Sequence, residues 1–439
     1  MHLDQQLTKR LTEYLPKALL ILIVAVLCIS TGLSVFYLIH DYDYLKNWFL
    51  GLNDCFYGRE YWTNDFFTPL VKAKGNKFAV CGLILSVSGI VYAIANIKRY
   101  WNVHPYKNDD LSWQNWRWHM AIFIWAACLW CWGYNISATS YDEAFSAVNC
   151  SELPLFQNIA YYMLPNNHVY FNVFNHLLFG WYWDPVVSGR FVSFFAYVIM
   201  LFIVFSWFLK ITGNKLWSFL ALIPVSLQLM AWGFGFQARG YEWLLCSSWI
   251  AFTSLIRYID KGERNALKLN TIFCIVGFMM IPTYLYYFLS QALFMLLLMG
   301  YKKRIDFKFV KYQFFCVAIV FLCYLPTICF SGLHALLGNP YVRAEVPEVS
   351  TYLSGYYPAI KYFMDCVYGQ LFGEDKTLNY VVLAIPLFLF LSKDIKKRRY
   401  ALFFFLQWLC LAIINISMRS TPPARTAIFI FSISIAMTL

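Results

Sequence analysis

Long apolar runs alternate with short polar or basic segments along the whole chain. Pro282 interrupts the stretch 270–300, and because proline removes a backbone donor and kinks a helix, we expect two short helices in a hairpin there. With the hairpin and a short final run, the pattern predicts an all-α polytopic membrane protein with about 12 transmembrane helices. The other runs that cross, or nearly cross, a hydrocarbon core of about 30 Å are 18–39, 78–97, 119–136, 190–209, 216–234, 241–259, 313–330, 378–392 and 401–417.

The final apolar run, 427–439, is too short to cross the membrane. At the rise of an α-helix it reaches only about 20 Å, which is less than the thickness of the hydrocarbon core. We therefore expect the chain to be truncated within this helix, rather than the helix to stop inside the membrane.

The composition agrees with a membrane protein. The chain is 60% hydrophobic, 21% aromatic and 13% charged, whereas soluble domains carry about 25% charged residues. So much apolar surface cannot be hidden in one globular core, and the excess is expected to face lipid. The formal net charge of +12 does not indicate a nucleic-acid partner, because the basic residues lie in short clusters between the apolar runs.

The positions of lysine and arginine predict the orientation. With a cytoplasmic amino terminus, about two thirds of the 35 basic residues fall in cytoplasmic segments, for example in the cluster 393–399. Three long segments, 40–77, 137–189 and 331–376, are then outside and are expected to form helical extracytoplasmic loops. The cytoplasmic loops carry neither a GxxxxGK[ST] motif nor a GxGxxG motif. We therefore expect the chemistry to take place on the extracytoplasmic face.

Five short motifs lie on this predicted face. Two adjacent acids there suit general-base catalysis or metal binding. They suit equally well the start of a helix, where acids favour the dipole and a preceding serine caps. In chain order the motifs are Ser140-Tyr141-Asp142-Glu143, Pro165-Asn166-Asn167-His168, Gly189-Arg190, Gln237-Ala238-Arg239-Gly240-Tyr241 and Pro423-Ala424-Arg425-Thr426.

This order of motifs resembles the polyprenyl-phosphate-sugar-dependent glycosyltransferases of the GT-C superfamily, which include protein O-mannosyltransferases and the lipid A aminoarabinose transferase. The resemblance covers about three quarters of the chain. It implies a GT-C-like transmembrane catalytic module over 119–439, preceded by an N-terminal extension, 1–118, with two transmembrane helices and an outside loop. In the family the acidic motif usually follows the first span, so the extension is a departure.

The resemblance implies transfer of a sugar from a polyprenyl-phosphate-linked donor to a glycan, lipid or protein acceptor, with inversion. The reaction would take place at the outer face of a bacterial inner membrane. Asp142 is then the expected base, with Glu143 as its orienting or metal-binding neighbour. A divalent metal ion on these two acids stays open, and no other cofactor is implied.

The same resemblance assigns residues to the donor. Arg239 and Arg425 are expected to bind its phosphate, since guanidinium groups pair bidentately with phosphate oxygens. The other residues expected to bind the phosphate or the sugar are His168, Asn166, Asn167 and Tyr241.

Other interpretations stay open. A glycan or lipid transporter (a flippase) would place charged groups near mid-membrane, often within internal repeats, and these spans are nearly free of charge and show no repeat. An O-antigen-type polymerase or ligase would depend on outside arginines more than on an acidic pair. For single residues, an arginine at a membrane interface often only extends toward the headgroups, and a histidine between asparagines often belongs to a turn.

Overall fold

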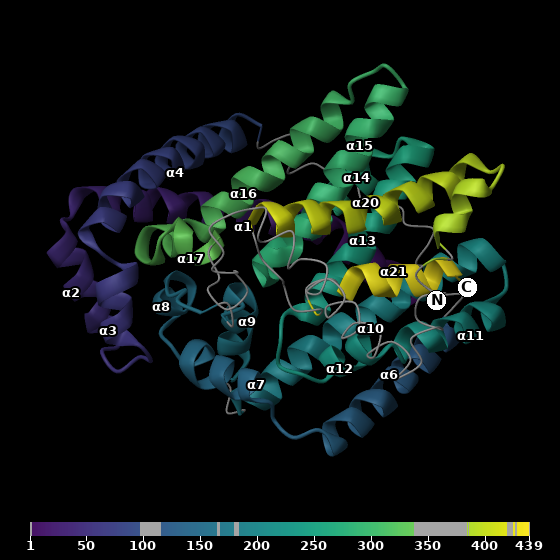
Figure 1. Ribbon diagram of the computed structural model, residues 1–439, viewed down its shortest axis with the longest axis horizontal. Helices are drawn as coiled ribbons and strands as arrows, with labels where there is room; N and C mark the ends of the chain where they lie inside the picture. The colour runs from purple at the N-terminus through teal and green to yellow at the C-terminus, as the bar shows by residue number, and fades with distance from the viewer. Residues whose placement is uncertain are drawn as a thin grey trace. The chain divides into compact units, whose positions relative to one another are not determined.

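The computed structural model describes residues 2–96, 116–164, 167–179, 184–337, 384, 386–418, 425 and 428–438. These residues form helices and turns but no strand (Figure 1). The chain divides into two compact units. Unit 1 is Met1–Gln114, Leu153–Pro165 and Phe314–Leu337, and unit 2 is Asn115–Glu152, Asn166–Gln313 and Gly338–Leu439.

Six helices of the described residues are long and apolar enough to cross a membrane, so the protein is an all-α polytopic integral membrane protein. Two further pairs of helices pass the same test together but are bent, and counting each pair as one span raises the number to eight. The bent pairs are Trp116–Ile136 with Tyr141–Ser151, at 98°, and Lys215–Ser226 with Leu229–Gly235, at 82°. The six are Lys17–Ile39, Pro69–Ala95, Pro185–Thr212, Pro282–Tyr301, Phe307–Ser331 and Ile395–Ser417.

Four expected spans differ from this set. The first helix of the expected 270–300 hairpin and the final run form α14 (Arg264–Met280) and α21 (Ile428–Thr438), and neither is among the six or the bent pairs. The run 241–259 does form a helix, α13, but α13 is not among the six. Most of its residues are buried within unit 2, and they include Ser247, Ser248 and Ser254, so the helix packs against protein on most of its surface. Of the run 378–392, residues 378–383 and 385 lie outside the described residues.

Unit 1 is held together by an aromatic core. The rings of Phe49 and Trp62 stack with 4.4 Å between their centroids, and those of Phe67 and Phe330 with 5.2 Å. The Tyr37 hydroxyl donates a 2.8 Å hydrogen bond to a backbone carbonyl of α16. The elements of this unit are α1 (His2–Ile39), α2 (Tyr42–Leu52), α3 (Arg59–Tyr61), η1 (Trp62–Phe66), α4 (Pro69–Ala95), α8 (Leu155–Ala160), α17 (Leu333–Leu337) and, from Phe314, α16 (Phe307–Ser331).

Unit 2 holds the first residues of α16 and the remaining elements. Several begin with a side-chain cap; Asp184, for example, accepts from two backbone N–H groups at the start of α10. The elements are α6 (Trp116–Ile136), α7 (Tyr141–Ser146), η3 (Ala147–Ser151), α9 (Val169–Phe179), α10 (Pro185–Thr212), α11 (Lys215–Ser226), α12 (Leu229–Gly235), α13 (Tyr241–Lys261), α14 (Arg264–Met280), η4 (Pro282–Tyr284), α15 (Leu285–Tyr301), η5 (Leu389–Leu391), α20 (Ile395–Met418) and α21 (Ile428–Thr438).

The predicted break at Pro282 is confirmed. Helix α14 ends at Met280, and α15 begins after the short 3-10 turn η4. The amide of Asn270 on α14 donates a 2.9 Å hydrogen bond to the amide oxygen of Gln291 on α15. The hydrogen bond therefore joins the two helices by a polar contact between buried amides.

Candidate functional site

The site begins at the sharp bend after α6, where α7 starts with a capping box. The Ser140 hydroxyl accepts from the Glu143 N–H, and the Glu143 carboxylate accepts in return from the Ser140 N–H at 2.9 Å. Of the two interpretations left open for this motif, the helix start capped by Ser140 is present in the structure. The cap fixes the first turn of α7, so that the carboxylates of Asp142 and Glu143 point in different directions.

The Glu143 carboxylate is completely buried and fully bonded. Its Oε1 accepts from Arg190 Nε at 3.0 Å and from the Ala238 N–H at 2.8 Å, and its Oε2 accepts from Arg190 Nη2 at 3.2 Å in addition to the Ser140 bond. A carboxylate offers about four lone-pair directions, and four donors occupy them. Glu143 therefore joins α7, α10 and the segment before α13, and in this arrangement it presents no oxygen to a metal ion or a substrate.

Asp142, the neighbouring acid, lies between two arginines instead. Its Oδ2 is 3.3 Å from Arg425 Nη1 and 3.5 Å from Arg239 Nη2, and 30% of its side chain is exposed. Arg239 also donates at 3.1 Å to the backbone carbonyl of Asp142 and, again at 3.1 Å, to the Ser146 hydroxyl. The carboxylate is thus within reach of solvent, while Arg239 is anchored by groups other than that carboxylate.

His168 has a defined tautomer. The Gly240 N–H donates a 2.8 Å hydrogen bond to His168 Nδ1, so the ring proton is on Nε2. This Nε2 is buried and has no hydrogen-bond partner among the described residues. Burial, together with the nearby Arg239 and Arg425, lowers the pKa of His168 well below its usual range. The histidine is therefore neutral, with one buried N–H donor unused.

Tyr241 brings these groups together. Its ring lies 5.0 Å from that of His168 in an edge-on contact, with the guanidinium carbons of Arg239 and Arg425 at 5.7 and 5.6 Å from its centroid. The tyrosine is buried at the start of α13. Its ring therefore contacts one imidazole edge-on and has two guanidinium groups within cation–π distance.

Asn167 is positioned by a polar network that the sequence analysis missed. Asn172 donates to Asn167 Oδ1 at 2.8 Å and accepts from the Ser151 hydroxyl at 3.2 Å. Asn175, one turn further along α9, donates to the same hydroxyl at 3.1 Å. The signal was available, because polar residues recur at 168, 172, 175 and 176 in an apolar helix, which is the spacing of one helix face. Asn166 lies outside the described residues.

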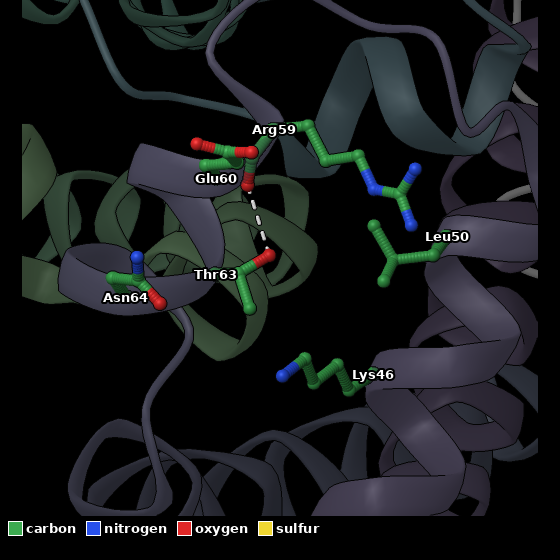
Figure 2. Close-up of a pocket in the computed structure, with 6 residues that line it drawn as sticks. All are labelled: Lys46, Leu50, Arg59, Glu60, Thr63 and Asn64. Carbon is green, nitrogen blue, oxygen red and sulfur yellow. Dashed lines mark hydrogen bonds between the residues drawn. The ribbon is translucent and has the colours of Figure 1, made fainter.

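No group of three or more His, Cys, Asp or Glu within the described parts of the chain could hold a metal ion. A separate pocket of about 400 Å³ lies in unit 1, and none of the predicted site residues lines it (Figure 2). Its walls are Lys46, Leu50, Arg59, Glu60, Thr63 and Asn64.

Comparison with known proteins gives no relative: no protein-family model, no curated protein and no solved structure matches the chain. The chemistry of the site therefore has to be derived from its residues. Arg239, Arg425 and the His168 Nε2–H supply hydrogen-bond donors that suit an anion. Asp142 supplies a solvent-accessible proton acceptor beside them.

Proposed function

We propose that the protein is a membrane glycosyltransferase that transfers a sugar from a polyprenyl-phosphate-linked donor to an acceptor. The observation that supports this most is the grouping of one accessible carboxylate, Asp142, with Arg239, Arg425 and the unused N–H of His168. Such a grouping offers a proton acceptor and a phosphate-binding surface within one site.

The proposed reaction uses both parts. An acceptor hydroxyl attacks the anomeric carbon from the side opposite the phosphate, and Asp142 takes its proton. The bond between the anomeric carbon and the phosphate oxygen breaks, and its electron pair leaves with the lipid phosphate. Attack from the opposite side inverts the anomeric configuration. Arg239, Arg425 and His168 stabilise the negative charge that develops on the leaving group.

We also propose a topology and a membrane for the protein. About 12 spans in a GT-C-like arrangement, a cytoplasmic amino terminus and a bacterial inner membrane are supported by the apolar runs, the basic loops and the order of motifs. In that orientation the segment with Asp142 and His168 is extracytoplasmic, where the isoprenoid tail of the donor stays in the bilayer beside the site.

The test is a transfer assay. Purified protein in proteoliposomes is supplied with a panel of radiolabelled polyprenyl-phosphate sugars and with glycan, lipid and peptide acceptors. We expect one donor to be consumed, with label appearing in an acceptor, and we expect Arg239→Ala to weaken donor affinity. Donor that crosses the bilayer unchanged would instead support a transporter, and intact donor with every acceptor would contradict the proposal.

A further inference from the structure

Asp142 occupies the position that an anionic ligand would take. Its Oδ2 contacts the guanidinium groups of both Arg239 and Arg425, and these are the groups proposed to hold the donor phosphate. The two arginines thus already bind one anionic group of the protein itself.

We infer that the carboxylate of Asp142 and the phosphate of the lipid donor compete for the same two arginines, so that donor binding displaces Asp142 and frees it as the base. This inference rests on the proposed function. It gives the aspartate a second role, as the exchangeable counter-ion of the phosphate site.

The local structure allows this exchange at Asp142 and prevents it at Glu143. The Glu143 side chain is fully buried, with four hydrogen bonds, whereas that of Asp142 is 30% exposed to solvent. Arg239 keeps its bonds to the Asp142 backbone carbonyl and the Ser146 hydroxyl when the carboxylate leaves. The guanidinium therefore stays in place to receive the phosphate.

The exchange also couples product release to proton movement. When the acceptor hydroxyl gives its proton to Asp142, the aspartate becomes neutral and no longer competes for Arg239 and Arg425. The phosphate then leaves the sugar with an additional negative charge and is held tightly. Once Asp142 passes its proton to water, its carboxylate can return to the arginines and displace the lipid phosphate.

The experiment measures binding of the product alone. Wild-type protein, Asp142→Asn and Asp142→Ala are titrated in detergent with radiolabelled polyprenyl phosphate, and their monodispersity is checked first. Asp184→Asn is the matched control, because Asp184 is an exposed acid of unit 2 whose carboxylate caps α10, and asparagine caps equally well. We expect both Asp142 variants to bind about tenfold more tightly than wild type, as for removal of a competing contact of moderate strength, and Asp184→Asn to match wild type.

Two results would overturn the inference, and they can be told apart. If Asp142→Asn and Asp142→Ala bind polyprenyl phosphate no more tightly than wild type, while wild type binds it and transfers sugar, the exchange is wrong and the proposed function stands. If wild type binds no polyprenyl phosphate and consumes no donor, the proposed function fails and the exchange fails with it.

Discussion

Asp142 and Glu143 are neighbouring acids of α7, and both contact arginine side chains. The two contacts differ in burial, in geometry and in access to solvent. Glu143 and Arg190 form a fully buried, bidentate pair in which further backbone donors complete the carboxylate's bonds. Asp142 shares one oxygen between Arg239 and Arg425 at longer distances and keeps contact with solvent. The two adjacent acids therefore have different roles. Glu143 stabilises the fold, and Asp142 has a carboxylate that a substrate can reach.

The difference follows from burial. A buried ion pair is costly to break, because removing one partner leaves an unpaired charge in a medium of low dielectric constant. The partly exposed Asp142 carboxylate is expected to contribute less, since water can solvate it and Arg239 keeps its bonds to the Asp142 carbonyl and the Ser146 hydroxyl. The α7 cap directs Glu143 inward and leaves Asp142 at the accessible side.

The largest effect is expected at the buried pair. Glu143→Gln should lower the free energy of unfolding by about 3–5 kcal/mol, because the buried Arg190 keeps its charge but loses its carboxylate. Denaturant unfolding of the purified protein measures this free energy, with Asp142→Asn as the matched substitution at the preceding residue. The Asp142 variant should stay within about 1 kcal/mol of wild type, and equal losses for the two variants would remove the distinction between the contacts.

The next effect concerns turnover. Asp142→Asn should lower the rate of sugar transfer about 1,000-fold, which lies within the range for loss of a general base. Transfer of label from the donor identified in the panel assay measures the rate. A variant that binds the donor and transfers at the wild-type rate would show that another group takes the proton.

A smaller effect is expected at His168. His168→Ala should weaken binding of polyprenyl phosphate about tenfold, as for loss of one hydrogen bond to a charged group. His119→Ala, a half-buried histidine of α6, should leave that affinity unchanged and serves as the control. If both variants bind like wild type, the unused Nε2–H does not contact the phosphate.

The smallest effect is expected at the cap. Ser140→Ala should destabilise the protein by about 1 kcal/mol, because the first turn of α7 loses its hydroxyl acceptor while the Glu143–Arg190 pair remains. Ser140→Thr keeps a capping hydroxyl and should match wild type within about 0.5 kcal/mol. A loss at Ser140→Ala as large as that at Glu143→Gln would mean that the cap, rather than the ion pair, fixes α7.

Local features of this chain could be predicted from its sequence, since their causes are local. Apolar runs formed helices, the chain broke at the proline at 282, and Ser140 capped a helix, as one of the two interpretations of its motif held. The pairing of Glu143 with Arg190, 47 residues later, could not be predicted, because periodicity carries no information about long-range partners. The bends of 98° and 82° and the burial of α13 are likewise results of tertiary packing.

A structure of the protein with polyprenyl phosphate bound would test the proposed site most directly. We expect the phosphate within hydrogen-bond distance of Arg239, Arg425 and His168 Nε2, with the Asp142 carboxylate turned away from both arginines. Phosphate bound elsewhere, with Asp142 still paired to Arg239 and Arg425, would contradict it.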